Sequence, residues 1–224
     1  MRINEIFCSI NGESSRSGMR TVFIRAHGCS IFCNYCDSLY AVQGNEYTNM
    51  TVDEIIREVE KYDCRRVTLT GGEPLIQSDA LELIDELCKR QYAVEIETNG
   101  AVDLAELINK REHISTMGVS GYDSLLITMD WKCPGSGMHS KMIESNLSIL
   151  DFDDVVKCVV SDKVDLDEMA EICKRTDAMV YVSPVFGRIE PRKIAEYLID
   201  NKINDVVLQL QIHKIIWDPN MRGV

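Results

Sequence analysis

Along most of the chain, short apolar runs rich in β-prone residues alternate with amphipathic runs of helical period. The segments TVFIRAHG (21–28) and RRVTLTGG (65–72) read as strands, and TVDEIIREVEKY (51–62) between them reads as a helix. Thr51 and Glu54 stand at the two positions of a capping box, which predicts that this helix begins at Thr51. Further strands are predicted at 92–100, 124–132, 153–161, 178–187 and 204–214, and further helices at 78–90, 103–111, 164–176 and 190–201.

Strands that alternate with helices, and that read as apolar on both faces, predict βαβ units and a mostly parallel α/β sheet. We count about six to seven strands after residue 20, one or two fewer than an eightfold barrel. The pattern leaves open a partial barrel and a doubly wound sheet. In both folds the carboxyl ends of the strands meet on one face, and here they read HGC, TGGEP, ETNG, DWK, VVS, VSP and IHK.

The composition is that of a globular protein, with 224 residues, 45% hydrophobic and 27% charged, and we expect one domain. A formal net charge of −12 disfavours a surface that grips nucleic acid, because phosphate binding needs clustered Lys and Arg. The opening MRINEIFCSINGE has no long apolar core, so we expect neither a signal peptide nor a membrane span. Nine cysteines, an odd number, then indicate reduced thiols in the cytoplasm.

The stretch HGCSIFCNYCDS places Cys29, Cys33 and Cys36 in a loop after the first of these strands. Free structural thiols are a poor explanation for three cysteines in eight positions. A zinc site would need His27 as its fourth ligand, and a fully thiolate-bound electron carrier would need a fourth cysteine closer than Cys64. A [4Fe–4S] cluster bound through three of its irons uses the set as it stands and leaves the fourth iron open.

The segment CSIFCNYC resembles the C-x3-C-x2-C signature of the radical S-adenosylmethionine superfamily. The resemblance implies that the open iron binds the amino and carboxylate groups of S-adenosylmethionine, which is cleaved to a 5′-deoxyadenosyl radical. The glycines of TGGEP permit close approach of a ligand, and the carboxylates and amides at the strand ends supply acceptors. The cofactor-binding residues implied are Asp37, Gly72, Glu73, Glu97, Asn99, Asp130, Trp131, Lys132 and Ser183.

Three longer segments are similar to one family, the 7-carboxy-7-deazaguanine synthases of queuosine and deazapurine biosynthesis. They are EIFCSINGESSRSGMRTVFIRAHGCS near the start, DWKCPGSGM in the middle and QIHKIIWDPNMRGV at the end, so the resemblance covers essentially the whole chain. It implies a partial, incomplete TIM-like barrel of about six parallel βα units. Residues 1–224 would form a single radical S-adenosylmethionine core domain with an N-terminal extension (about 1–20) and a C-terminal tail (about 214–224).

The implied reaction converts 6-carboxy-5,6,7,8-tetrahydropterin to 7-carboxy-7-deazaguanine and ammonia by radical ring contraction. Arg25 fits this reaction because a guanidinium inside an apolar strand needs a partner, and a substrate carboxylate is suitable. A buried salt bridge to Glu13 or Glu97 is the alternative. The substrate-binding residues implied are Ile10, Asn11, Gly12, Glu13, Arg25, Thr70, His213 and Val224.

The family also implies Mg²⁺, held by the hydroxyl that follows the cysteine–aspartate pair, and here Ser38 stands where threonine is usual. The usual Gln-Gly-Glu-Gly is Asn-Gly-Glu-Ser at residues 11–14. We expect a homodimer supplied with electrons by a flavodoxin- or ferredoxin-type donor. Two alternatives remain, a glycyl-radical-enzyme activase and a non-catalytic iron–sulfur or zinc protein.

Overall fold

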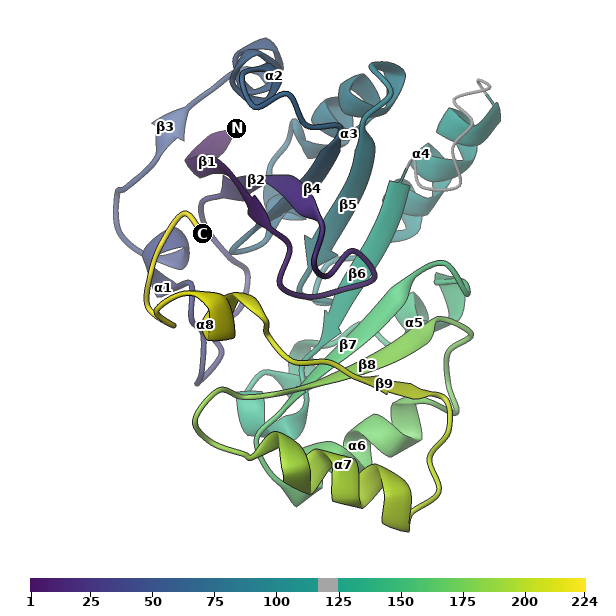
Figure 1. Ribbon diagram of the computed structural model, residues 1–224. Coiled ribbons are helices and arrows are strands. Elements are labelled where there is room, and N and C mark those ends of the chain that lie inside the picture. The colour runs from purple at the N-terminus through teal and green to yellow at the C-terminus, as the bar shows by residue number, and fades with distance from the viewer. Residues whose placement is uncertain (117–124) are drawn as a thin grey trace.

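In the described residues of the computed structural model, 1–116 and 125–224, nine strands form one sheet in the order β3-β1-β2-β4-β5-β6-β7-β8-β9 (Figure 1). Strand β1 pairs antiparallel with β2 and β3, and each of the remaining pairs is parallel. The strands are β1 Arg2–Ile10, β2 Arg20–Ala26, β3 Thr48–Asn49, β4 Arg66–Gly71, β5 Ala93–Thr98, β6 Leu125–Trp131, β7 Val155–Val160, β8 Met179–Pro184 and β9 Val206–Leu208.

Five of the described α-helices lie where the sequence pattern predicts them, and three short ones, at 39–42, 145–149 and 213–216, were not predicted. The α-helices are α1 Leu39–Val42, α2 Val52–Glu60, α3 Ala80–Lys89, α4 Ala105–Thr116, α5 Ser145–Ile149, α6 Lys163–Ile172, α7 Pro191–Asp200 and α8 His213–Ile216, with 3₁₀ turns at Pro74–Ile76, Pro134–Ser136 and His139–Lys141. The capping box of α2 is confirmed, since Thr51 Oγ1 accepts from the Glu54 amide and Glu54 Oε2 accepts from the Thr51 amide.

The strand order decides between the two architectures that the sequence leaves open. From β2 to β9 the parallel strands follow one another in chain order, without the reversal that defines a doubly wound sheet. The edge strands β3 and β9 do not pair, so the described sheet is open. The prediction of a partial barrel of about six parallel βα units is therefore confirmed.

The sequence prediction differs from the structure near both ends of the chain. The antiparallel β1 was not predicted, because its residues carry no clear alternation. The strand predicted at 204–214 is limited to Val206–Leu208, and His213 begins helix α8 instead of ending a strand. The first residue of the strand predicted at 124–132 lies outside the described residues.

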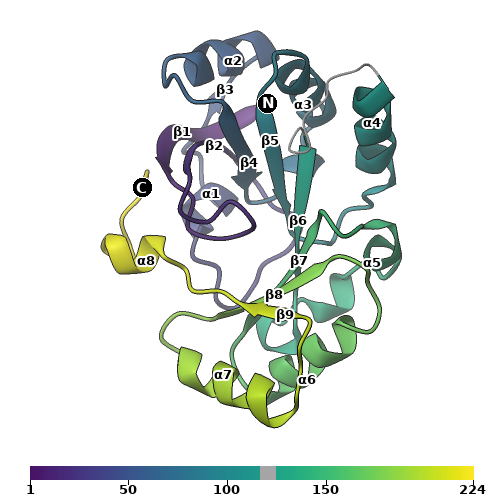
Figure 2. The ribbon, with the colours of Figure 1, turned by 45° about the vertical axis from the view of Figure 1, so that its right-hand side comes forward.

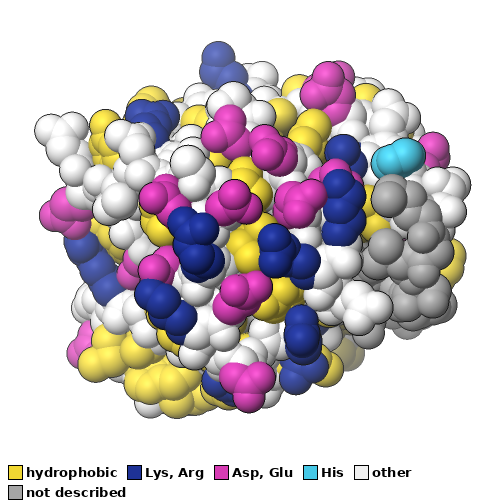
Figure 3. Space-filling view, turned by 90° about the horizontal axis from the view of Figure 1, so that it is seen from above, with side chains coloured by type: hydrophobic (Ala, Val, Ile, Leu, Met, Phe, Trp, Pro, Cys, Tyr) yellow, Lys and Arg dark blue, Asp and Glu magenta, His cyan; other side chains and the backbone are white. Residues whose placement is uncertain are grey.

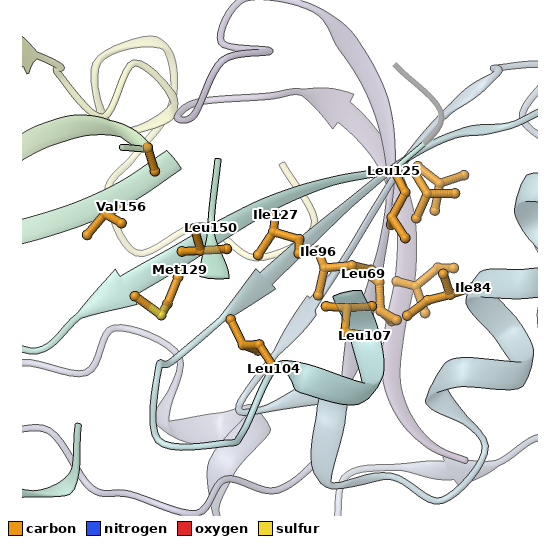
Figure 4. Packing of buried hydrophobic residues seen from close by; sticks show 14 of the residues in the cluster. Leu69, Ile84, Ile96, Leu104, Leu107, Leu125, Ile127, Met129, Leu150 and Val156 are labelled. Carbon is orange, nitrogen blue, oxygen red and sulfur yellow. The ribbon is translucent and has the colours of Figure 1, made fainter. Parts of the chain in front are cut away.

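The sequence predicts strands that are apolar on both faces, but the central strands are apolar on one face only. Their apolar side chains point toward α3 and α4, where Leu69, Ile96 and Ile127 pack against Ile84 and Leu107 (Figure 4). Their alternate side chains are polar and point to the opposite face. These polar residues are Thr68 and Thr70 on β4, Glu95 and Glu97 on β5, and Thr128 and Asp130 on β6.

The two faces of the sheet therefore serve different purposes. Helices α3, α6 and α7 pack on the apolar face, whereas α8 and the C-terminal segment lie on the other side, near α1 (Figures 1 and 2). The surface seen in Figure 3 mixes Lys and Arg with Asp and Glu. Among residues 1–116 and 125–224, no helix combines the length and the apolar character that a membrane crossing requires.

Candidate active site

A cavity of about 620 Å³ opens on the polar face, at the carboxyl ends of β2 and β4–β7. This is where parallel α/β proteins gather their functional side chains. All of the site residues predicted from the sequence line this cavity except Glu73, Trp131 and Ser183. The structure thus brings together one set of residues from both ends and the middle of the chain.

The three exceptions are buried behind the cavity wall. Glu73 accepts hydrogen bonds from the Thr98 hydroxyl (3.0 Å) and the Asn99 amide (2.6 Å), so it supports the cavity-lining Asn99 from behind. Trp131 is 1% exposed and donates through Nε1 to Glu168 Oε1 (3.0 Å). Ser183 is fully buried, and its hydroxyl has no hydrogen-bond partner in the described part of the chain.

The cysteine loop is anchored to the strand ends by polar contacts. The Asn34 amide donates to the Ser136 carbonyl (2.9 Å), and the Tyr35 hydroxyl donates to the Val159 carbonyl of β7 (3.0 Å). On the other side, Gly72 lies so close to the loop that a Cβ there would collide with the Gly28 carbonyl and stand 3.0 Å from the Cys29 Cβ. The loop is therefore held in place before any ligand binds.

The donor set fits a cluster better than a single ion. Cys29, Cys33 and Cys36 are free thiols that line the cavity, and the Asn99 amide nitrogen lies 3.3 Å from Cys29 Sγ. Within the described ranges, no three His, Cys, Asp or Glu side chains converge closely enough to hold one metal ion. In a cubane each cysteine binds a different iron, so its ligands stand further apart than those of zinc.

Burial raises the pKa of Cys33 to about 11 and raises that of Cys36, although Lys132 acts in the opposite direction on both. These thiols would be protonated at neutral pH without a metal, and iron must displace their protons. Among the described residues, no fourth cysteine lines the cavity. The arrangement accordingly supports three protein ligands and one open iron.

A row of alternating charges crosses the cavity floor. Lys132 Nζ lies 2.7 Å from Asp130 Oδ2, and Lys157 Nζ lies 3.2 Å from Asp130 Oδ1 and 2.9 Å from Glu13 Oε2. Burial alone would raise the pKa of Asp130, but the two ammonium groups lower it. Lys157 was missed in the sequence, although a lysine inside the apolar run VVKCVV is the same signal that identified Arg25.

Arg25 does have a partner within the protein, but it is neither of the two acids considered from the sequence. Its Nε donates to Glu5 Oε1 (2.7 Å), which also accepts from the Tyr40 hydroxyl (2.8 Å). Because β1 was not predicted, Glu5 could not be placed beside Arg25. Glu97 instead accepts from the Thr70 hydroxyl (2.7 Å), and burial raises the pKa of Glu97.

The C-terminal segment forms one wall of the cavity. The Ile212 amide donates to the Gly12 carbonyl (3.2 Å), and the His213 ring fills the space that a Cβ on Gly12 would need. Lys214 Nζ lies 2.8 Å from Asp37 Oδ2, while the Ser38 hydroxyl donates to Asp37 Oδ1 (3.0 Å).

Beyond His213 the tail contacts α1 and the segment that follows it. The guanidinium carbon of Arg222 lies 3.8 Å from the Tyr40 ring centroid, and its Nη1 lies 3.0 Å from Glu46 Oε2. The terminal Val224 lines the cavity. Sequence reasoning missed both side chains: Tyr40 lies outside the quoted motifs, and Arg222 lies in the C-terminal segment but was not given a role.

A fold of this kind with a three-cysteine loop at the carboxyl ends of its strands defines a radical S-adenosylmethionine enzyme. In agreement, residues 23–130 match the model of the radical SAM superfamily. Such enzymes bind a [4Fe–4S] cluster and S-adenosylmethionine.

The relatives then identify the family. The chain is 45% identical over its whole length to the 7-carboxy-7-deazaguanine synthase of Clostridium acetobutylicum, of which it covers 99%. It is 35% identical, again over its whole length, to the enzyme of that name from Chlorobaculum tepidum, of which it covers 97%. The chain belongs to the 7-carboxy-7-deazaguanine synthase family.

Solved structures agree with the fold. The crystal structure of QueE from Escherichia coli superimposes with a TM-score of 0.71 at 20% identity, covering 93% of this chain and 92% of the other. Streptococcus suis SuiB bound to S-adenosylmethionine superimposes with a TM-score of 0.56 over 83% of this chain and 48% of its own. At these identities the likeness concerns the fold.

Proposed function

We propose that this chain converts 6-carboxy-5,6,7,8-tetrahydropterin to 7-carboxy-7-deazaguanine and ammonia, in 7-deazapurine (queuosine) biosynthesis. One observation carries the proposal: a three-cysteine loop and a wall of buried acids, amides and cations line the same cavity. The 45% identity to a 7-carboxy-7-deazaguanine synthase supports this reaction over the activase and the electron carrier.

Cys29, Cys33 and Cys36 would hold the cluster. When bound, the cluster and S-adenosylmethionine supply a one-electron cleavage that produces a radical able to abstract hydrogen. The cofactor-binding set would lie beside the cysteines, because Gly72 and Asn99 contact the loop directly. Glu73, Trp131 and Ser183 would act from behind the wall, Glu73 by orienting Asn99.

The substrate would bind along the opposite wall, formed by the turn 10–13, Arg25, Thr70 and the C-terminal segment. In this wall, Glu13 offers a buried acceptor to the substrate. Its Oε1 is buried and accepts no hydrogen bond from any described residue, and the pyrimidine edge of a pterin carries N–H donors. Asn11 acts differently from the expectation, since its amide donates to Glu95 (3.2 Å) and its Oδ1 accepts from the Glu13 amide (3.2 Å). It orders the turn that presents Glu13.

The chain's own residues would also keep water away from the radical. Val224 and its neighbours in the tail line the cavity, and His213 packs on Gly12. Exclusion of water protects a reactive intermediate and strengthens the polar contacts inside. Burial lowers the pKa of His213 and so favours the neutral ring, which can donate one hydrogen bond and accept another.

We extend the proposal to the metal ion, the oligomeric state, the cellular compartment and the electron donor that the family implies. Ser38 would supply a hydroxyl ligand to Mg²⁺ beside the substrate carboxylate, and Asp37 next to it carries the negative charge that attracts a cation. The enzyme would be a cytoplasmic homodimer of single-domain chains, reduced by a flavodoxin- or ferredoxin-type donor. What supports these points is membership of the family and the position of Ser38 in the cavity wall.

The test is anaerobic reconstitution with iron, sulfide, S-adenosylmethionine, a reductant and carboxytetrahydropterin. We expect 7-carboxy-7-deazaguanine and one equivalent of ammonia, with S-adenosylmethionine regenerated. A reconstituted enzyme that cleaves S-adenosylmethionine but forms no carboxydeazaguanine contradicts the proposal.

Magnesium is tested separately with Ser38→Ala and Ser38→Thr. We expect stimulation by Mg²⁺ in the wild type and in Ser38→Thr, and its loss in Ser38→Ala. Equal stimulation of all three proteins would exclude Ser38 as a ligand.

A further inference from the structure

Lys157 is the cation that connects the two halves of the cavity floor. It lies on β7 directly opposite Asp130 of β6 in the parallel ladder, and its side chain is 7% exposed. Its ammonium group lies 3.2 Å from Asp130 Oδ1 and 2.9 Å from Glu13 Oε2. Asp130 belongs to the cofactor-binding set and Glu13 to the substrate-binding turn, so one side chain touches both.

We propose that Lys157 is a positioning residue for the pterin: it fixes one oxygen of Glu13 so that the other faces an N–H of the substrate. The inference rests on the proposed function, in which Glu13 is the acceptor for the pterin. Glu13 Oε2 is held by Lys157, while Oε1 is buried and without a donor in the described part of the chain. Buried acceptors are normally satisfied, so the arrangement leaves one place for a ligand donor.

The electrostatics of the cavity support this role. Glu13, Glu97 and Asp130 all lie close enough to Lys157 to favour its charged form, and together they outweigh its burial and raise its pKa. His213 does not replace it as a cation, because burial lowers the pKa of the imidazole. Without Lys157, Glu13 would face two other acids, with no cation paired to it.

A role in stability alone would not explain this choice of residue. A buried ion pair is often no more stabilising than apolar side chains of the same volume, because desolvation offsets the attraction. Val155 and Val159, two positions away on the same face of β7, show that this face otherwise uses such side chains. The pair Lys157–Glu13 instead gives the carboxylate one orientation.

The experiment compares Lys157→Met and Lys157→Arg with a matched control, Lys163→Met, whose side chain is 76% exposed on α6. Binding of 7-carboxy-7-deazaguanine and of S-adenosylmethionine to the anaerobic holoenzyme is measured by calorimetry, with iron content and the unfolding midpoint as checks on folding. We expect Lys157→Met to weaken carboxydeazaguanine binding by at least about tenfold, since truncating one partner of a buried ion pair leaves the other uncompensated.

Binding of S-adenosylmethionine should change much less, because Lys132 still pairs with Asp130. Lys157→Arg should recover part of the lost affinity, and Lys163→Met should match the wild type. In turnover, Lys157→Met should raise KM for the pterin more than it lowers kcat, and form more 5′-deoxyadenosine per product.

A double-mutant cycle tests whether Lys157 acts through Glu13. If it does, Glu13→Gln with Lys157→Met should bind carboxydeazaguanine no more weakly than Glu13→Gln alone. If Lys157→Met alone fails to fold, the double variant can still be compared with Glu13→Gln. It removes one charge of each sign, so neither partner of the ion pair is left buried and unpaired.

The inference is overturned by an active wild type whose Lys157→Met variant binds carboxydeazaguanine normally, and also by additive losses in the cycle. If Lys157→Met weakens the binding of both ligands equally and lowers the iron content, Lys157 has a structural role and the inference is also overturned. A wild type that forms no carboxydeazaguanine would instead refute the proposed function.

Discussion

At the scale of single residues, the site depends on positions where only one side chain fits. The sequence suggested that Gly72 lets the backbone approach a ligand. In the structure the close neighbour is the chain itself, because Gly72 lies against Gly28 and Cys29 of the cysteine loop. Glu73, next to it, supports Asn99 from behind the wall. Both residues therefore act by shaping the loop and the strand ends around it.

Gly72→Ala should reduce cluster binding. Its Cβ would collide with the Gly28 carbonyl, so the cysteine loop would have to shift, and interiors yield little to such overpacking. We expect less than about half of the wild-type iron per chain after reconstitution. Gly187→Ala is the control, since a Cβ there meets nothing within 4 Å. Equal iron content in Gly72→Ala and the wild type would refute the prediction.

Glu73 should make stability depend on pH. Burial raises its pKa from 4.5 to about 7, so the folded state binds the proton more tightly than the unfolded chain does. The stabilisation is complete below about pH 4.5 and decreases as the pH rises to about 7, by up to roughly 3 kcal/mol. The difference between wild type and Glu73→Gln in urea unfolding should follow this trend. A difference independent of pH would contradict it.

At the scale of elements, the two ends of helix α7 follow from the residues that stand there. Helix α7 begins with Pro191 at its first turn and ends at Asp200, close to the predicted 190–201. Beyond it, Lys202 has a φ of 54°, a left-handed conformation that favours glycine. Its amide donates to the Ile199 carbonyl (3.1 Å), which completes the helix end.

Lys202→Gly should stabilise the protein. Glycine removes the cost of a side chain in the left-handed region, partly offset by the greater freedom of the unfolded chain. We expect the free energy of unfolding to increase by about 0.5–1 kcal/mol. Lys193→Gly, an exposed position inside α7, should have the opposite sign and cost about 1 kcal/mol. If both variants are destabilised equally, the explanation is wrong.

At the scale of the whole molecule, the two ends of the chain together complete the cavity. The C-terminal segment contacts the opening turn through Ile212 and Gly12, and Gln209 exchanges two hydrogen bonds with the Ser14 backbone (2.7 and 2.8 Å). Arg222 then reaches Tyr40 and Glu46. The sheet itself stays open, and these contacts of the C-terminal segment connect its last strand to the turn that follows its first strand.

Arg222→Ala should loosen the tail without weakening the fold. The ion pair with Glu46 is exposed, and such pairs contribute about 0–1 kcal/mol, as does an exposed cation–π contact. We expect amide hydrogen exchange in residues 218–224 to become about three- to tenfold faster, with an unchanged unfolding midpoint. Arg192→Ala, which removes an exposed pair within α7, is the control. Unchanged exchange in the tail would show that Arg222 does not hold it.

The sequence by itself determined what depends on neighbours along the chain. The alternation of strands and helices, the capping box at Thr51 and the spacing of the three cysteines are local patterns. The structure confirms the capping box and the alternation, although the last predicted strand is shorter. The strand-end motifs also indicated which residues would meet, because parallel strands place their carboxyl ends at one edge. Membership of the family followed from the same motifs.

Only the tertiary structure decided which distant groups face one another. The partner of Arg25 is Glu5, from a strand that no pattern predicted, and Glu13 meets Lys157 across 144 positions of the chain. Trp131 follows Asp130 directly, yet it points into the core because successive side chains of a strand lie on opposite faces. Such pairings depend on the order and register of the strands, which packing of the whole chain determines.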